Sequence, residues 1–124
     1  MNQNRFGLQD SDMDVINKIL MNYDEIEEAY IFGSRAKGNY RQGSDVDIAL
    51  KGEDIKRSQV LEISDLLNEE TNMPYRFDIV HFDSIDRREL SEHILRVKKV
   101  IYRRVANLVL QEPKTKYNTQ KNII

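Results

Sequence analysis

The sequence predicts a single α+β domain in which a small mixed β-sheet is backed by helices. Segments with apolar residues at helical spacing alternate with short apolar segments typical of strands. The chain has 124 residues, which is enough to bury one hydrophobic core but too few for two domains. The predicted order is helix, strand, short turn helix, strand, helix, strand, helix, and this order favours the α+β class.

The first predicted helix follows a polar lead-in over residues 1–10. Ser11 or Asp12 is expected to cap this helix, and Asn22 to Asp24 is expected to end it. Its apolar positions recur at intervals of three and four residues and are Met13, Ile16, Ile19 and Leu20.

Two predicted strands flank a glycine-containing turn. Glu28 to Phe32 is predicted as the first strand and Asp45 to Leu50 as the second. Between them, Gly33 and Ser34 are expected to form a tight turn that opens a short helix, and a polar loop follows.

The next segment predicts a helix and a third strand. Glu53 or Asp54 is expected to start a helix over 55–70, which has one apolar face. Pro74 disfavours helical geometry in the residue before it, so the helix should end there. Arg76 to Phe82 alternates in polarity and is predicted as the third strand.

The last predicted helix and strand complete the domain, which is expected to span residues 1–103. Asp83 to Asp86 is expected to cap a helix over about 87–97, and Val100 to Tyr102 is predicted as a short last strand. Residues 104–124 are mostly polar and are predicted as a C-terminal extension, partly helical or disordered.

Composition excludes several kinds of protein. The net charge of -2 gives no general attraction to nucleic acid, so direct nucleic-acid binding is not expected. The chain contains no cysteine, which excludes thiol nucleophiles and cysteine-ligated zinc, and it has only His81 and His93 as imidazole ligands. No apolar run approaches the ~20 residues of a membrane span, and the first residues lack the apolar core of a signal peptide. We therefore expect a cytoplasmic protein without membrane association.

The central feature of the sequence is the stretch from Gly33 to Asp47. Asp45 and Asp47 lie two positions apart on the second predicted strand, so both carboxylates point to the same face. Two like charges held about 6–7 Å apart along a strand repel each other unless a cation lies between them. The pair therefore predicts a metal site, with oxygen ligands suited to Mg²⁺ or Mn²⁺.

The residues around this pair suggest chemistry on phosphates. A Gly-Ser turn between a strand and a helix presents backbone N–H groups and a hydroxyl, which suit a phosphate. Asp78 lies on the third predicted strand and would complete a cluster of three carboxylates if that strand neighbours the second. A phosphate site beside such a cluster indicates metal-dependent phosphoryl or nucleotidyl transfer.

The same residues carry a resemblance to a known family. Gly33-Ser34, then ten residues, then Asp45-x-Asp47 resembles the signature of the DNA polymerase β-type nucleotidyltransferases. The sequences of Ile31–Gly38 and Ser44–Leu50 are similar to the corresponding segments of the minimal nucleotidyltransferases.

The similarity also extends beyond this motif. Three further segments resemble the MntA antitoxins, which are paired with HEPN-domain toxins of the HepT type. These segments are Phe6 to Leu8, Pro74-Tyr75 with Asp78, and Leu90 to Tyr102. In all, the resemblance spans about residues 6–103.

The resemblance implies a polymerase β palm-like fold and a set of residue roles. Gly33 and Ser34 would bind the β- and γ-phosphates of ATP. Asp45 and Asp47 would hold two Mg²⁺ ions per active site, with Mn²⁺ as a substitute, and Asp47 and Asp78 would share the ion nearest the acceptor. Asp78 would also activate the acceptor hydroxyl, as a base or through that ion. The implied product is AMP on a tyrosine of a HepT-like toxin, which blocks its RNase site, with release of diphosphate.

Each motif residue also has a simpler interpretation. Arg35 and Lys37 either neutralise triphosphate charge or are solvated. Ser44 either contacts nucleotide or holds the loop before Asp45. Asp78 alone could be an outward carboxylate on any strand.

Three functions remain open from the sequence. The first is an antitoxin that transfers AMP to its toxin. The second is an antitoxin that only sequesters the toxin, although this would not require a metal cluster. The third is nucleotidyl transfer to a small molecule such as an aminoglycoside, or to RNA, which the small size and mild acidity of the chain disfavour.

Overall fold

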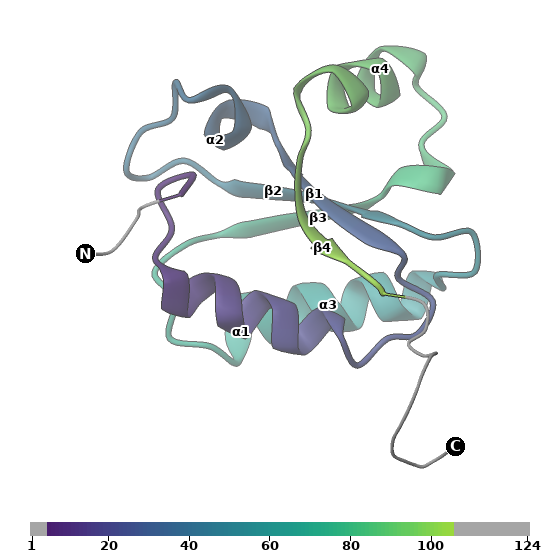
Figure 1. Ribbon diagram of the computed structural model, residues 1–124, viewed down its shortest axis with the longest axis horizontal. Helices are drawn as coiled ribbons and strands as arrows, with labels where there is room; N and C mark the ends of the chain where they lie inside the picture. Colours follow the sequence, from purple (N-terminus) through teal and green to yellow (C-terminus); the bar gives the residue numbers. More distant parts are fainter. Residues whose placement is uncertain (1–4, 106–124) are drawn as a thin grey trace.

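The computed structural model describes residues 5–105, which form a four-stranded sheet with helices on both faces (Figure 1). This confirms the predicted α+β class with a small mixed sheet. In chain order the elements are α1 (Asp10–Leu20), β1 (Glu28–Phe32), α2 (Gly33–Lys37), β2 (Val46–Lys51), α3 (Arg57–Glu69), β3 (Phe77–His81), the 3-10 turn η1 (Phe82–Ser84), α4 (Arg88–Val97) and β4 (Lys99–Arg103).

The sheet order is β3-β2-β1-β4, and its pairing is mixed. β1 runs antiparallel to both β2 and β4, whereas β2 and β3 are parallel. The parallel pair requires a crossover, which α3 supplies as it packs beneath the sheet (Figure 1). Two register pairs position the site described below: Phe32 lies opposite Asp47, and Asp47 lies beside Asp78.

The alternation of side chains along the strands builds two separate apolar clusters. The larger cluster lies between the sheet and the helices α1 and α3, and it includes Ile16, Ile31, Ile48 and Ile63. The smaller cluster lies on the opposite face and joins Tyr30, Phe32 and Ala49 to Ile94 of α4. Residues of one strand therefore divide between two layers, as the period of two requires.

The predicted starts of α1 and α3 are wrong. In both helices a polar side chain at the third helical position accepts a hydrogen bond from the backbone N–H of the residue before the helix. α1 begins at Asp10, and Asp12 accepts the Gln9 N–H at 3.0 Å from the third helical position. In α3, Gln59 Oε1 accepts the Lys56 N–H at 2.9 Å in the same way. Glu53 and Asp54 do not start α3, because buried Ile55 holds the chain in the core before the helix begins at Arg57.

The third strand is shorter than predicted because Phe82 leaves it to begin η1. His81 holds this turn. Its Nε2 lies 2.7 Å from the Gly52 carbonyl, which can only accept a hydrogen bond, so Nε2 carries the proton. In the neutral ring Nδ1 then accepts from the Ser84 hydroxyl at 2.8 Å. Asp83 accepts the Gly52 N–H at 2.8 Å, so its carboxylate fixes this turn instead of capping α4.

The chain beyond β4 remains attached to the domain for a short distance. The Arg104 N–H donates to the Glu27 carbonyl at 2.9 Å, and its guanidinium donates to the Tyr23 carbonyl at 2.9 Å. The predicted partly helical or disordered extension lies outside the described residues from residue 106 onward. Across residues 5–105, every helix is too short or too polar to cross a lipid bilayer.

Candidate active site

Three carboxylates lie on one face of the sheet, at the end where β2 and β3 begin. Asp47 and Asp78 are register partners in the parallel pair, so their side chains point the same way. Asp45 precedes Asp47 by two residues and lies just outside β2, which begins one residue later than predicted. Asp47 and Asp78 share the face of Phe32, which packs with α4, and Asp45 is near enough for its charge to act on Asp47. The sequence left open whether the third strand neighbours the second, and the structure shows that it does.

The surroundings of Asp47 disfavour its charged form. Burial of the carboxyl group, followed by the negative charges of Asp78 and Asp45, raises the pKa of Asp47 to about 6. The nearby Arg35 guanidinium acts in the opposite direction but is outweighed. A divalent cation would relieve both the repulsion and the desolvation, because it supplies positive charge next to the carboxylates.

The residues fit a divalent cation in donor chemistry but are not gathered into a finished ligand set. Carboxylate oxygens are the ligands that Mg²⁺ and Mn²⁺ prefer. Within residues 5–105, no three acidic or imidazole side chains converge closely enough to hold an ion together. Asp45 and Asp78 are exposed, whereas Asp47 is half-buried, so the two outer side chains are free to turn toward an ion that approaches from solvent.

Gly33 lies directly against Asp47. Its φ of +73° is in the left-handed region, and a Cβ built on it would clash with Asp47 Oδ2. Both the backbone conformation and the close approach therefore require glycine. The Gly33-Ser34 turn and the carboxylates are consequently neighbours in space, as the predicted combination of phosphate site and metal site requires.

Arg35 is placed differently from the predicted contact with nucleotide. Only 2% of it is exposed, and its guanidinium donates hydrogen bonds to the carbonyls of Phe6 and Ser44. The structure thus assigns it to holding backbone segments. Lys37 of α2 is exposed. Ser44 holds the loop as well, because its hydroxyl accepts the Arg41 N–H at 2.9 Å.

Asn68 of α3 supports the site, although the sequence did not point to it. Its side-chain amide donates to the Phe77 carbonyl at 3.0 Å and accepts the Phe77 N–H at 2.8 Å. One side chain thus satisfies both backbone groups of the residue before Asp78 and fixes the start of β3. In the sequence, the only sign of this role was an amide side chain within the predicted amphipathic helix over 55–70.

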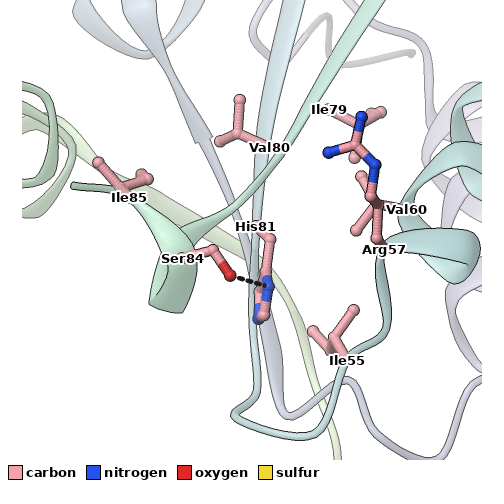
Figure 2. A pocket seen from close by; sticks show the side chains of 8 residues that line it. All are labelled: Ile55, Arg57, Val60, Ile79, Val80, His81, Ser84 and Ile85. Carbon is pink, nitrogen blue, oxygen red and sulfur yellow. Dashed lines mark hydrogen bonds between the residues drawn. The ribbon is translucent and has the colours of Figure 1, made fainter. Parts of the chain in front are cut away.

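A separate hollow of about 370 Å³ lies at the other end of β3 (Figure 2). It is lined mainly by apolar side chains, among them Ile55, Val60 and Ile79, with Arg57 at its margin. His81 and Ser84 also face it, but their mutual hydrogen bond belongs to the turn described above. This hollow and the carboxylates therefore occupy different parts of the molecule.

Comparison with protein families gives the class. The family model described as "Polymerase beta, Nucleotidyltransferase" matches residues 14–107. The chain belongs to this nucleotidyltransferase family. None of the curated proteins matches it in sequence.

Solved structures of toxin–antitoxin pairs share this fold. A crystal structure of a toxin–antitoxin with AMP-PNP matches with a TM-score of 0.63 and 22% identity, over 75% of this chain and 74% of that chain. The toxin–antitoxin MntA–HepT matches with a TM-score of 0.59 and 21% identity, over 77% and 74%. The tri-AMPylated Shewanella oneidensis HEPN toxin in complex with MNT antitoxin matches with a TM-score of 0.58 and 20% identity, over 76% and 71%. At these identities the likeness establishes the fold.

Proposed function

We propose that the chain is a Mg²⁺-dependent protein adenylyltransferase that moves AMP from ATP to a tyrosine hydroxyl of a HEPN-domain toxin, and so acts as its antitoxin. The observation that carries the proposal is the pairing of Asp47 with Asp78 on one sheet face, with Gly33 packed against Asp47. Together these features resemble a site for a nucleoside triphosphate beside a metal-binding cluster.

In the proposed reaction, each residue has a defined part. Asp45, Asp47 and Asp78 would hold Mg²⁺, which when bound supplies positive charge against the phosphate oxygens. The backbone and hydroxyl of Gly33-Ser34 would orient the β- and γ-phosphates, leaving the α-phosphorus in front of the carboxylates.

The transfer itself forms one bond and breaks one. The tyrosine oxygen bonds to the α-phosphorus, and the bond from that phosphorus to the bridging oxygen breaks. The electron pair leaves with diphosphate. An Asp78 carboxylate oxygen accepts the tyrosine proton, for which its exposed position on the edge strand is suited.

The proposed partner follows from the structures that share the fold. Those structures include a HEPN toxin carrying AMP groups in complex with an MNT antitoxin, and a toxin–antitoxin with AMP-PNP. A protein acceptor also suits this site, because the exposed carboxylates of Asp45 and Asp78 are open to a large molecule.

The test is an intact-mass measurement of a HEPN-domain toxin after incubation with this chain, ATP and Mg²⁺. We expect the toxin to gain the mass of one or more AMP groups. Asp45→Asn with Asp47→Asn should abolish the gain, whereas Asp65→Asn on the outer face of α3 should not change it. Protection of cells by the wild type without any mass gain would favour sequestration of the toxin instead.

A further inference from the structure

The guanidinium of Arg35 joins backbone segments that are distant in the sequence. Its Nη1 donates to the Phe6 carbonyl at 2.8 Å, and its Nε and Nη2 donate to the Ser44 carbonyl at 3.1 and 2.8 Å. Nη2 also lies 3.4 Å from the Gln42 carbonyl. A planar, permanently charged fork can hold several carbonyls at fixed angles, which a lysine cannot do.

Two aromatic rings complete the surroundings of this guanidinium. Its central carbon lies 5.1 Å from the centre of the Tyr40 ring and 5.3 Å from that of Tyr75. Both distances suit cation–π attraction. The Tyr75 hydroxyl donates to Asp12 Oδ2 at 2.8 Å, which anchors the approach to β3 on helix α1.

The turn formed by residues 5–8 fits closely onto Arg35. The Leu8 N–H donates to the Arg5 carbonyl at 2.7 Å, and Phe6 and Gly7 both have positive φ, +59° and +77°. A Cβ on Gly7 would lie 2.5 Å from Arg35 Nη1 and 2.6 Å from the Tyr40 ring. Glycine at this position therefore permits the contact between the turn and the guanidinium.

Three of these residues lie close in the sequence to residues of the candidate site. Ser44 is followed by Asp45, Tyr75 precedes Asp78 by three residues, and Arg35 itself follows Gly33 by two. We propose that Arg35 is a positioning residue that fixes Asp45 relative to Gly33 and Asp47, and that the turn 5–8 is part of this support. The turn lies before residue 14, where the match to the family model begins. The proposal rests on the proposed function for its effect on catalysis.

The test compares Arg35→Lys and Gly7→Ala with Gly38→Ala in the full chain. Gly38 is a matched control because its φ is +90° but a Cβ there would meet nothing within 4 Å. The first measurement is amide hydrogen exchange in residues 5–8 and 41–46 without metal. The second is the Kd of Mn²⁺ alone, by electron paramagnetic resonance. The third is kcat and KM for ATP in AMP transfer.

We expect exchange to become faster in both segments together in Arg35→Lys and Gly7→Ala. The Kd of Mn²⁺ should rise about 10-fold, as found when partners outside the ligand set are lost. The kcat should fall more than KM for ATP rises. Gly38→Ala should change none of these by more than about 2-fold. If Arg35→Lys does not fold, Tyr40→Leu should give the same pattern more weakly, because it removes one ring and no hydrogen bond of the guanidinium.

Two results would overturn the proposal. A raised KM for ATP with unchanged exchange and unchanged Mn²⁺ affinity would make Arg35 a direct triphosphate contact. Equal behaviour of Gly7→Ala and Gly38→Ala would remove the turn 5–8 from the support. Failure of the proposed function is distinguishable, since it abolishes AMP transfer by the wild type while the exchange measurement still decides the role of Arg35.

Discussion

At the scale of single residues, Asp47 connects the stability of the fold to the proposed chemistry. It is half-buried, lies beside Asp78, and contacts the Cα region of Gly33. A position chosen for stability alone would not place an ionisable group among like charges. Such a conflict is expected of a position that binds a cation, because the cation supplies the compensating positive charge.

Replacing Asp47 by Asn should therefore stabilise the metal-free protein at neutral pH. The folded-state pKa of Asp47 is raised to about 6 from its ordinary value of 3.8. Its stabilising, protonated form is fully present below that ordinary value and is lost as the pH rises through about 6. At pH 7 we expect Asp47→Asn to be more stable by about 1 kcal/mol, allowing for partial exposure of the group.

Thermal unfolding in chelator at several pH values measures this difference. It should shrink as the pH falls from 7 to 4, and saturating Mg²⁺ should stabilise the wild type but not the variant. An Asp47→Asn protein that is less stable than wild type at pH 7 in chelator would contradict the account.

Gly33→Ala should remove activity through local geometry. The added Cβ would displace the Asp47 carboxylate, and the positive φ would add strain of about 1 kcal/mol. We expect AMP transfer to fall by at least about 100-fold, because small misplacements at a reacting centre have effects of that size. Gly38→Ala carries the strain without the contact and serves as the control; equal rates in the two variants would exclude the contact as the cause.

At the scale of secondary-structure elements, the sequence predicted each strand and helix but not how the strands pair. Residues 29–32 form a short continuous apolar segment and 76–82 alternates in polarity, and both patterns are typical of strands. Pairing depends on contacts between distant segments. The position of β3 beside β2 is fixed by α3 and by Asn68, neither of which leaves a local pattern around Asp78.

The burial of Arg35 could not be predicted for a related reason. An arginine after a phosphate-binding turn is chemically suited to a triphosphate, and nothing near it in the sequence indicates burial. Its partners Phe6 and Ser44 lie 29 and 9 residues away. The motif residues Gly33, Asp45 and Asp47 were easier to predict, since their spacing along one strand–turn–strand unit fixes their arrangement.

The packing of α3 against the sheet is predicted to dominate the stability of this unit. Ile63 is fully buried in the larger cluster, whereas Leu61 of the same helix is 55% exposed. Ile63→Ala should lower the free energy of unfolding by about 2–4 kcal/mol, through lost burial and a cavity. Leu61→Ala should change it by less than about 0.5 kcal/mol. Urea unfolding measures both; similar values for the two would mean that α3 is packed differently.

At the scale of the whole molecule, the two layers of helices have different charge. Segments 9–27 and 52–76, which contain α1 and α3, carry twelve acidic and four basic side chains. The candidate site lies on the other face of the sheet, beside α2 and α4 (Figure 1). Because the candidate site lies on this face, we expect the acceptor protein to approach from the side of α2 and α4.

The central claim is that Asp45, Asp47 and Asp78 act as one nucleotidyl-transfer site. It is tested most directly by the rate of AMP transfer from ATP to the HEPN toxin, measured for each Asp→Asn variant and for all three combined, with Asp65→Asn as the control on the acidic layer. We predict that each single change lowers the rate by at least about 100-fold and that the control is unchanged. The triple variant should be hardly slower than the slowest single variant, because the three residues act as a unit. A wild-type rate in Asp78→Asn would contradict the account.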